Sequence, residues 1–432
     1  MGDRLKDRVF TEIFPHFAAG FIHNIRAQAN KPQANFSDES LQIVYEGTLT
    51  FLYRLMFVLY AESLELLPLY ETRGYRELSL YKLKGELRER AGDILDEAPA
   101  KLQQQYNTLS TDLYDRLTDL FTVIDTGSDA LNLPTYNGGL FSRSNENGEF
   151  LADYKIPDRH LALGLDRLCR DVDDKTQALA FIDYKSLGVR HLGSIYEGLL
   201  EFKLQIAQEE LAVIKEKGKE IYQPAAAIAQ SRRVQDTIAK GAVYLENDKK
   251  ERKATGSYYT PDYIVKYIVE HTVGPVLARK FADLTPRLRA AQRQYRQHEQ
   301  KVRARGSDQP ADLFWNEPAM RQLADDCLNV RVLDPAMGSG HFLVEVVDFV
   351  SNRLIDFLNG WSDNPVWALL NRTREDILGE MERQRVTIDA DRLTRVALLK
   401  RAVLKRCVYG VDLNLMAVEL AKVSLWLDAF TL

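Results

Sequence analysis

Residues 332–343 read Val-Leu-Asp-Pro-Ala-Met-Gly-Ser-Gly-His-Phe-Leu. An apolar run gives way to an acid, a proline and two glycines, and then becomes apolar again. This pattern predicts a buried parallel strand over 330–333, a tight loop, and a helix from about His341. Glycine lets the backbone approach a ligand closely, and open α/β sheets bind ligands at the carboxyl ends of their strands. Because Asp334 stands at that end, we expect the loop to bind a nucleoside-containing cofactor.

A second strand and turn are predicted in Cys407-Val-Tyr-Gly-Val-Asp-Leu-Asn414, followed by a helical run over 416–427. Asp412 ends this strand, where an acid commonly accepts hydrogen bonds from ribose hydroxyls. The gap from the glycine loop is far longer than the roughly 20 residues of a dinucleotide fingerprint. Residues 345–405 are helical and amphipathic in pattern, so an inserted helical excursion accounts for the gap. The loop also lacks the full Gly-x-Gly-x-x-Gly pattern, which makes NAD the weaker candidate.

A third motif lies upstream, in Lys253-Ala-Thr-Gly-Ser-Tyr-Tyr-Thr-Pro-Asp262. Thr260-Pro261 predicts a helix start, with Thr as the N-cap and Pro at the first helical position, before an apolar helix over 264–273. A helix N-terminus favours an anion, such as the carboxylate of an amino-acid moiety.

Composition excludes several classes of protein. The 432 residues are 45% apolar and 28% charged, which predicts a soluble globular protein of two or three domains. The longest apolar run, 51–67, holds three charged residues, so we expect a core helix and no membrane partner. The start shows no export signal and the three cysteines fit no metal-ligand spacing, so we expect a cytoplasmic protein without disulfides or bound metal. With a net charge of −5, any contact with a polyanion must come from a local patch.

The first 240 residues are predicted to be mostly helical. Helical spacing of apolar residues marks 10–26, 42–67, 80–95, 103–125 and 192–217. A charged run over 247–253 indicates a linker or exposed loop, and strand–helix alternation follows it. The sequence thus suggests a helical domain over 1–240 and an α/β domain over 241–432, with helical insertions at about 277–325 and 345–405.

One segment of the second domain is strongly basic. Residues 279–305 hold nine Lys or Arg against two acids, Asp283 and Glu299. A solvated helix face is the simpler interpretation. The alternative is an arm that contacts phosphates, whose binding would weaken with salt.

The order of the three motifs resembles that of S-adenosylmethionine-dependent DNA adenine-N6 methyltransferases. The nearest likeness is to the type IIG restriction-modification enzymes and to the BREX phage-defence methylases of the PglX type. The helical region is similar too, in three segments: Arg54-Leu-Met-Phe-Val-Leu-Tyr-Ala-Glu62, Leu133-Pro-Thr-Tyr-Asn-Gly-Gly-Leu-Phe141 and Leu187-Gly-Val-Arg-His-Leu-Gly-Ser-Ile-Tyr-Glu-Gly-Leu-Leu200. The implied fold is a partial Rossmann-like α/β methyltransferase sheet preceded by a mostly helical domain.

The resemblance implies an S-adenosylmethionine site and assigns residues to it. Its methionine end would lie by Tyr258, Tyr259, Thr260 and Pro261. The loop around its amino-acid portion would comprise Asp334, Ala336, Met337, Gly338 and Gly340, with Phe342 packing behind. Asp412 would hold the ribose hydroxyls, and Leu413 would flank the adenine.

The family's catalytic motif, Asn or Asp followed by Pro-Pro and then Tyr or Phe, does not occur in these 432 residues. That motif holds and stacks the flipped target adenine. The nearest string, Asp363-Asn-Pro-Val-Trp367, is interpreted as a turn. We therefore expect the catalytic loop, the remaining strands and a target-recognition domain beyond Leu432 or on a partner subunit. The 432 residues alone are expected to be inactive on double-stranded DNA, which would be bound mainly by those regions.

Other interpretations stay open. The chain is alternatively a non-catalytic S-adenosylmethionine-binding subunit of a phage-defence complex, or a Rossmann oxidoreductase. Asp173 and Asp183-Tyr-Lys185 mimic the acid pattern of metal-dependent nucleases, although such patterns arise by chance in charged chains. His341 is expected to be a helix N-terminal residue with no part in acid–base chemistry.

Overall fold

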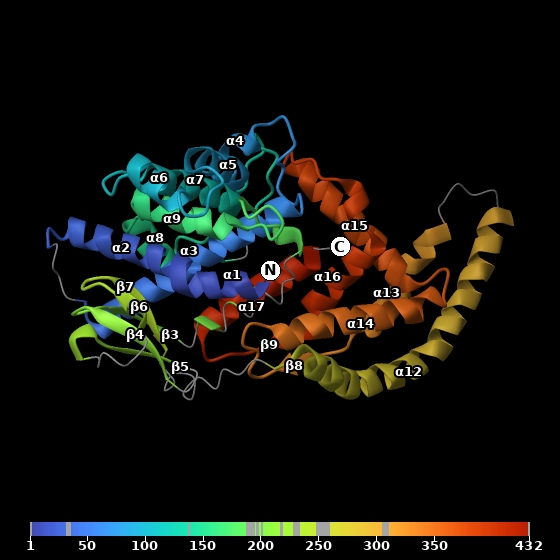
Figure 1. Cartoon of the computed structure of the whole chain (residues 1–432). Helices are drawn as coiled ribbons and strands as arrows, with labels where there is room; N and C mark the ends of the chain where they lie inside the picture. Colours follow the sequence, from blue (N-terminus) through green and yellow to red (C-terminus); the bar gives the residue numbers. More distant parts are fainter. Residues whose placement is uncertain are drawn as a thin grey trace. The chain divides into compact units, whose positions relative to one another are not determined.

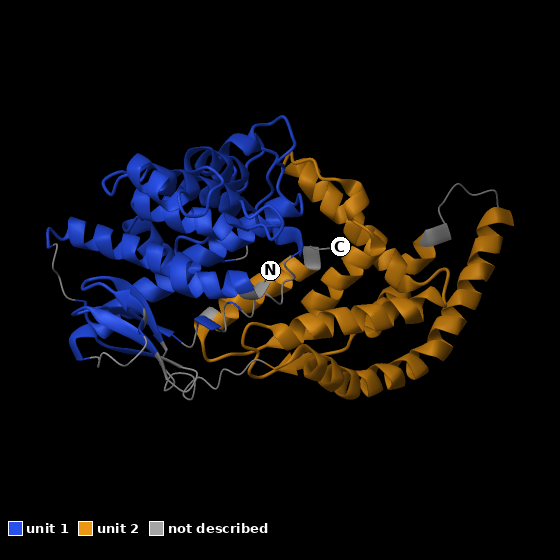
Figure 2. Cartoon of the chain, in the orientation of Figure 1, with its two compact units in different colours: residues 1–257 blue, residues 258–432 orange. Residues whose placement is uncertain are grey.

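The computed structural model describes residues 2–31, 36–136, 139–186, 195, 198–199, 202–216, 219–227, 234–247, 260–304 and 311–430. They form two compact units, Met1–Ser257 and Tyr258–Leu432 (Figure 2). The sequence suggested a division at 240/241. The later position arises because β7 (Val243–Asn247) pairs along its whole length with β3 (Phe202–Ile206), which ties it to the first unit.

Helices build most of the first unit (Figure 1). They are α1 (Gly2–Arg8), the π-helical turn η1 (Val9–Ile13), α2 (Phe14–Gln28), α3 (Asp38–Ser63), α4 (Tyr75–Leu78), α5 (Leu80–Ala91), α6 (Ala98–Gln105), α7 (Asp112–Thr126), α8 (Glu146–Asp153) and α9 (Asp158–Cys169). Helices thus lie in the predicted segments 10–26, 42–67, 80–95 and 103–125, and the described residues Ile195, Gly198 and Leu199 of the fifth segment are helical as well.

The central helix of this unit is α3. Ser37 caps its start, because the Ser37 side chain accepts a hydrogen bond from the Ser40 N–H. Among the described residues it is the one helix long and apolar enough to cross a membrane, but 89% of its apolar window is buried within the protein. It is therefore the core helix that the sequence predicted.

Short antiparallel strands complete the first unit. They are β1 (Arg170–Val172), β2 (Leu179–Phe181), β3, β4 (Leu211–Glu216), β5 (Lys219–Pro224), β6 (Val234–Ile238) and β7, with the 3-10 turns η2 (Tyr184–Ser186) and η3 (Ala225–Ala227). The sheets are β1-β2, β3-β7 and β5-β4-β6. The helix predicted over 192–217 is wrong in its second half, where β3 and β4 lie. Phe202-Lys-Leu-Gln-Ile206 alternates with period two, and that alternation prevails over the helical spacing.

Arg54 on α3 joins two of the segments that carry the family resemblance. Its Nε donates to the Leu140 carbonyl at 2.9 Å and its Nη2 to the Ser142 carbonyl at 3.0 Å. The Phe57 and Phe141 rings pack edge to face with centroids 5.1 Å apart. The guanidinium thus holds the loop that follows α7 against the core helix, which is a structural role.

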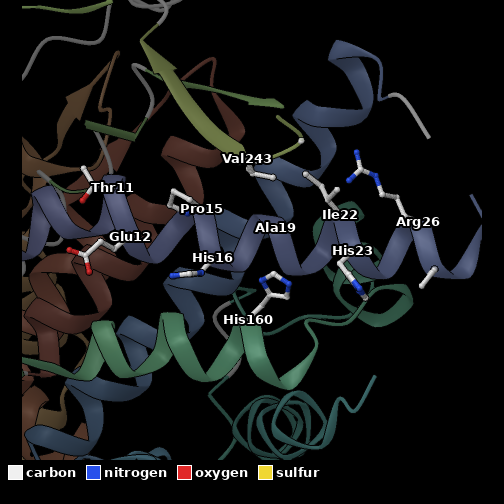
Figure 3. Close-up of a pocket in the computed structure, with 13 residues that line it drawn as sticks. Thr11, Glu12, Pro15, His16, Ala19, Ile22, His23, Arg26, His160 and Val243 are labelled. Atoms are coloured by element: carbon white, nitrogen blue, oxygen red, sulfur yellow. The ribbon is translucent and has the colours of Figure 1, made fainter. Parts of the chain in front are cut away.

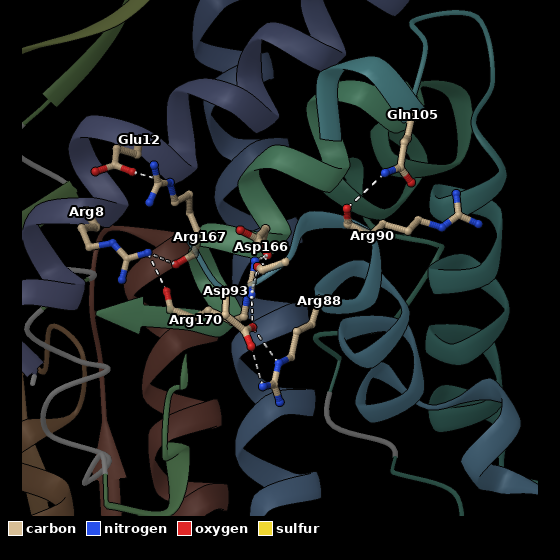
Figure 4. Close-up of polar contacts among 10 residues, drawn as sticks. Arg8, Glu12, Arg88, Arg90, Asp93, Gln105, Asp166, Arg167 and Arg170 are labelled. Carbon is tan, nitrogen blue, oxygen red and sulfur yellow. Dashed lines mark hydrogen bonds and ion pairs between the residues drawn. The ribbon is translucent and has the colours of Figure 1, made fainter. Parts of the chain in front are cut away.

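A second buried arginine, Arg170, is the residue that follows the last turn of α9 (Figure 4). The Arg170 side chain is 1% exposed, and its Nε donates to Asp166 at 2.8 Å. Its Nη1 donates to the Gly92 carbonyl at 2.7 Å and lies 3.2 Å from Asp93. Arg8 adds a hydrogen bond to the Arg170 carbonyl at 2.7 Å. The contacts with Asp166, Gly92 and Asp93 satisfy a charge that would be costly to bury alone.

The second unit contains the 43-residue α12 (Asp262–Ala304). It also contains η4 (Ala311–Asn316), α13 (Pro318–Leu328), β8 (Val332–Asp334), α14 (His341–Asn359), α15 (Pro365–Arg383), η5 (Ala390–Arg392), α16 (Arg395–Cys407), β9 (Val408–Gly410) and α17 (Leu415–Phe430). The segments predicted over 264–273 and from 277 form one continuous helix. Pro275 and Pro286 lie inside it, and the helix curves visibly (Figure 1).

The core of the second unit lies between α12, α13, α14, α15 and α16. One stripe of α12 faces it, from Val265 through Leu277 to Tyr295. Cys327 and Cys407 are buried in the same core as free thiols. Burial raises the pKa of the Cys327 thiol to about 12, so it is an inert core residue.

Candidate functional site

The strands β8 and β9 run parallel, with Asp334 opposite Gly410 at their carboxyl ends. Two backbone hydrogen bonds extend the pairing into the following loops. The Val411 N–H donates to the Asp334 carbonyl at 2.9 Å, and the Met337 N–H donates to the Val411 carbonyl at 3.0 Å. The glycine loop and the loop after β9 therefore lie side by side. The strand is not fully buried as expected, because Leu333 is 59% exposed on its other face.

The glycine loop requires its glycines. Gly338 and Gly340 have φ values of +52° and +83°, in the left-handed region that favours glycine. A Cβ on Gly340 would also lie 3.0 Å from the Cβ of Ala421 on α17. Gly340 therefore permits both the turn into α14 and close packing between α14 and α17.

Asp412, just after the neighbouring strand β9, is hydrogen-bonded to the glycine loop. Its Oδ2 accepts a hydrogen bond from the Gly338 N–H at 2.9 Å, and its Oδ1 accepts one from the Asn414 N–H at 2.8 Å. A carboxylate offers about four acceptor sites, so two bonds leave capacity for ligand hydroxyls. Asp412 is half-buried, and it lies where β9 ends.

Asp334 is held in a similar manner. Its Oδ1 accepts a hydrogen bond from the Ala336 N–H at 3.0 Å, while Pro335 and Ala336 are exposed. Leu413 is fully exposed, beside Asp412. The edge thus presents two carboxylates and an uncovered apolar side chain.

The start of α12 contacts the start of α14. His341 Nε2 lies 3.4 Å from Asp262 Oδ1. Thr260 is half-buried and Pro261 is exposed, and the helix begins at Asp262, one residue later than the sequence predicted. This contact places Asp262, the last residue of the upstream motif, beside the residue that follows the glycine loop. Tyr258 and Tyr259 lie outside the described residues.

Two residues assigned to the site have side chains in the interior. Met337 is 9% exposed and packs with Leu343 and Ala421 beneath the loop. Phe342 is half-buried against the main core of the unit. Sequence reasoning missed Gly410, where a Cβ would lie 2.1 Å from the Met337 sulfur. A glycine inside a strand is the signal for such close packing.

Two sequence patterns that mimic catalytic motifs have structural roles. Asn364 is the N-cap of α15, with its side chain accepting from the N–H groups of Val366 and Trp367. Asp173 accepts bonds from Thr176 in the β1-β2 turn, which lowers its pKa. Asp183 follows β2 at the opposite end of that hairpin, so the two carboxylates lie roughly 10 Å or more apart at about 3.3 Å per residue. The acids of the nuclease-like pattern therefore do not form a shared metal site.

The basic segment is part of α12. Arg287 pairs with Asp326 at 2.5 Å and Arg303 with Glu299 at 2.7 Å. Arg289, Arg293 and Arg296 are exposed on one helix face and form no ion pair with any residue that the structure describes.

Comparison with known proteins relates the chain to one enzyme class. No family model and no solved structure matches it. Over 179 residues it is 27% identical to a protein of Methanocaldococcus jannaschii named "putative type II restriction enzyme and methyltransferase". The matched segment is 41% of this chain and only 12% of that relative. The similarity supports a relationship to restriction-modification methyltransferases.

Proposed function

We propose that the chain is the cofactor-binding part of a DNA adenine-N6 methyltransferase of a restriction-modification or phage-defence system, and that it binds S-adenosylmethionine. The observation that carries the proposal is the hydrogen bond between Gly338 N–H and Asp412 Oδ2. It joins the glycine loop and the second acid at the carboxyl ends of adjacent parallel strands, where open α/β sheets bind nucleosides.

The groups at this edge suit the chemistry of the cofactor. The Asp334 carboxylate suits an ammonium group, and the Asp412 carboxylate suits a ribose diol. Leu413 offers an exposed apolar surface to a purine. The bound sulfonium supplies an activated methyl group, so the protein's task is to position it beside the target amine.

Calorimetric titration with S-adenosylmethionine and its demethylated product tests the proposal. Asp334→Ala and Asp412→Ala are expected to lower affinity roughly tenfold to a hundredfold, since each loses a hydrogen bond to a charged group. Asp356→Ala is the matched control, because Asp356 is exposed on α14 away from the loop. Equal affinity in all four proteins would overturn the site assignment. Transfer of labelled methyl to DNA by these 432 residues alone would contradict the expectation that the catalytic motif is needed.

A further inference from the structure

A cavity of about 590 Å³ lies in the first unit, outside the edge formed by β8 and β9 (Figure 3). One face of α2 forms its long wall, and residues of α9 and of the turn before β7 complete it. Its volume is within the usual range for small-molecule sites, roughly 300–1,000 Å³, and far exceeds what an inorganic anion fills. A ligand of this site would therefore be of drug or metabolite size.

Three of the chain's seven histidines line this cavity. His16 and His23 lie two turns apart on one face of α2, and His160 projects from α9 between them (Figure 3). The His23 and His160 ring centroids are 6.0 Å apart. Burial lowers the pKa of His16, and lowers that of His160 to about 4. These two imidazoles are therefore neutral near pH 7, and each offers one N–H donor and one acceptor nitrogen.

The charged groups at the two ends of the cavity differ. Glu12 at one end is neutralised by Arg167, whose Nε lies 3.0 Å from its carboxylate. Arg26 at the other end pairs with no carboxylate among the described residues. The Arg26 Nε and the His23 Nδ1 are both buried, and neither has a hydrogen-bond partner in the part of the chain that the structure describes. The cavity thus carries one unbalanced positive charge and unused polar groups, which favour an anionic ligand.

Apart from Thr11, the rest of the lining consists of small or apolar residues. Ala19 and Ile22 lie on α2 between His16 and His23, Pro15 lies just before His16, and Val243 lies opposite. Such a surface accommodates a flat ring, and the imidazoles can match the donors and acceptors at the edge of a heterocycle. A metal ion is disfavoured, because the described residues hold no cluster of three ligands that could bind one.

We propose that this cavity binds a free nucleotide, with its phosphate at Arg26 and its base between the imidazoles and the apolar wall of α2. This site is separate from the proposed cofactor site and does not depend on it.

Calorimetric titration of the whole chain tests the proposal with AMP, GMP, CMP, adenosine, inorganic phosphate and a short single-stranded oligonucleotide. At least one nucleoside monophosphate is expected to bind at least tenfold more tightly than adenosine or phosphate, because each of these lacks half of the recognised groups. Arg26→Gln removes the charge, and Ala19→Phe fills the cavity without removing a polar group. Both are expected to weaken nucleotide binding at least tenfold, whereas Arg76→Gln, at an exposed position on α4, is expected to leave it unchanged.

Three results would overturn the proposal: no binding of any nucleotide up to about 10 mM, equal binding by wild type and both cavity variants, or binding of the oligonucleotide alone. Asp412→Ala is expected to bind nucleotide as wild type does, so failure of the cofactor assignment stays distinguishable from failure of this one.

Discussion

The backbone N–H of Gly338 donates to the Asp412 carboxylate across 2.9 Å, although the two residues are 74 positions apart in the chain. One end of this bond lies in the loop after β8 and the other in the loop after β9. The bond makes Asp412 a part of the glycine loop's own structure as well as a residue of the proposed cofactor site.

Asp412→Ala is expected to loosen the glycine loop. The Gly338 and Asn414 N–H groups lose their acceptor, so their hydrogen exchange should accelerate at least tenfold, on the scale of about 1.4 kcal/mol. Exchange measured by mass spectrometry or NMR checks this, with amides in the middle of α14 as the internal control. Unchanged exchange at Gly338 would show that the loop does not need Asp412.

Gly340→Ala is expected to destabilise the second unit by about 1–3 kcal/mol. Alanine disfavours a φ of +83°, and its Cβ would crowd Ala421. Gly379→Ala is the matched control, since Gly379 lies inside α15 with nothing within 4 Å of an added Cβ. That control should gain up to about 1 kcal/mol from helix propensity. Denaturant titration compares the two, and a Gly340 variant as stable as the control would contradict the packing.

Arg54→Met is expected to lower the free energy of unfolding by roughly 2–4 kcal/mol. Methionine keeps much of the apolar volume but leaves the Leu140 and Ser142 carbonyls without their donor. Arg76→Met, at an exposed position, should cost little. Chemical denaturation followed by circular dichroism measures the free energy of unfolding. Near-equal losses of stability in the two variants would show that the Arg54 hydrogen bonds to the loop after α7 contribute nothing.

Glu62 is expected to make stability fall as pH rises. Its buried carboxyl accepts bonds from Tyr75 Oη and Leu80 N, yet burial raises its pKa from 4.5 to about 7. Between these values the folded protein holds a proton that the unfolded chain has released. The free energy of unfolding therefore decreases with rising pH, by at most about 1.4 kcal/mol per unit.

Glu62→Gln removes this dependence, so the variant should lose less stability than wild type between about pH 5 and 7.5. Thermal unfolding across that range measures the difference. Glu39→Gln, at an exposed position on the same helix, should follow the wild-type curve. Parallel curves for wild type and Glu62→Gln would contradict the raised pKa.

Neutralising the exposed face of α12 is expected to weaken DNA binding if the proposed function is correct. Arg289, Arg293 and Arg296 changed together to Gln should reduce the slope of log affinity against log salt by about two to three, at roughly 0.9 per phosphate contact. Three exposed arginines of the same unit, Arg321, Arg353 and Arg383, provide a control triple variant with equal net charge. Fluorescence anisotropy with duplex DNA distinguishes the two. Equal slopes would favour the simpler interpretation of a solvated face.

Local patterns predicted the segments that contain α2, α3, α5 and α7, and both strands of the candidate edge, whereas α8 and α9 lie outside every predicted segment. Apolar periodicity and a helix cap such as Ser37 depend on residues close together in the chain, so they can be recognised from the sequence alone. The helix prediction failed in the second half of 192–217, where helical spacing and strand alternation coexist and the pairing of β3 with β7 decides the structure. It also divided α12 near Pro275, although this proline lies inside one long helix, because proline usually ends a helix.

The sequence by itself determined Gly338 and Gly340 as turn residues, Asp334 and Asp412 as strand-end acids, and the order of the motifs. Only the tertiary structure decided that Met337 faces the core, that Gly410 makes room for it, and that three histidines from α2 and α9 share one cavity. The reason is physical. Backbone conformation depends on neighbours a few residues away, whereas burial and side-chain convergence depend on packing between segments far apart in the chain.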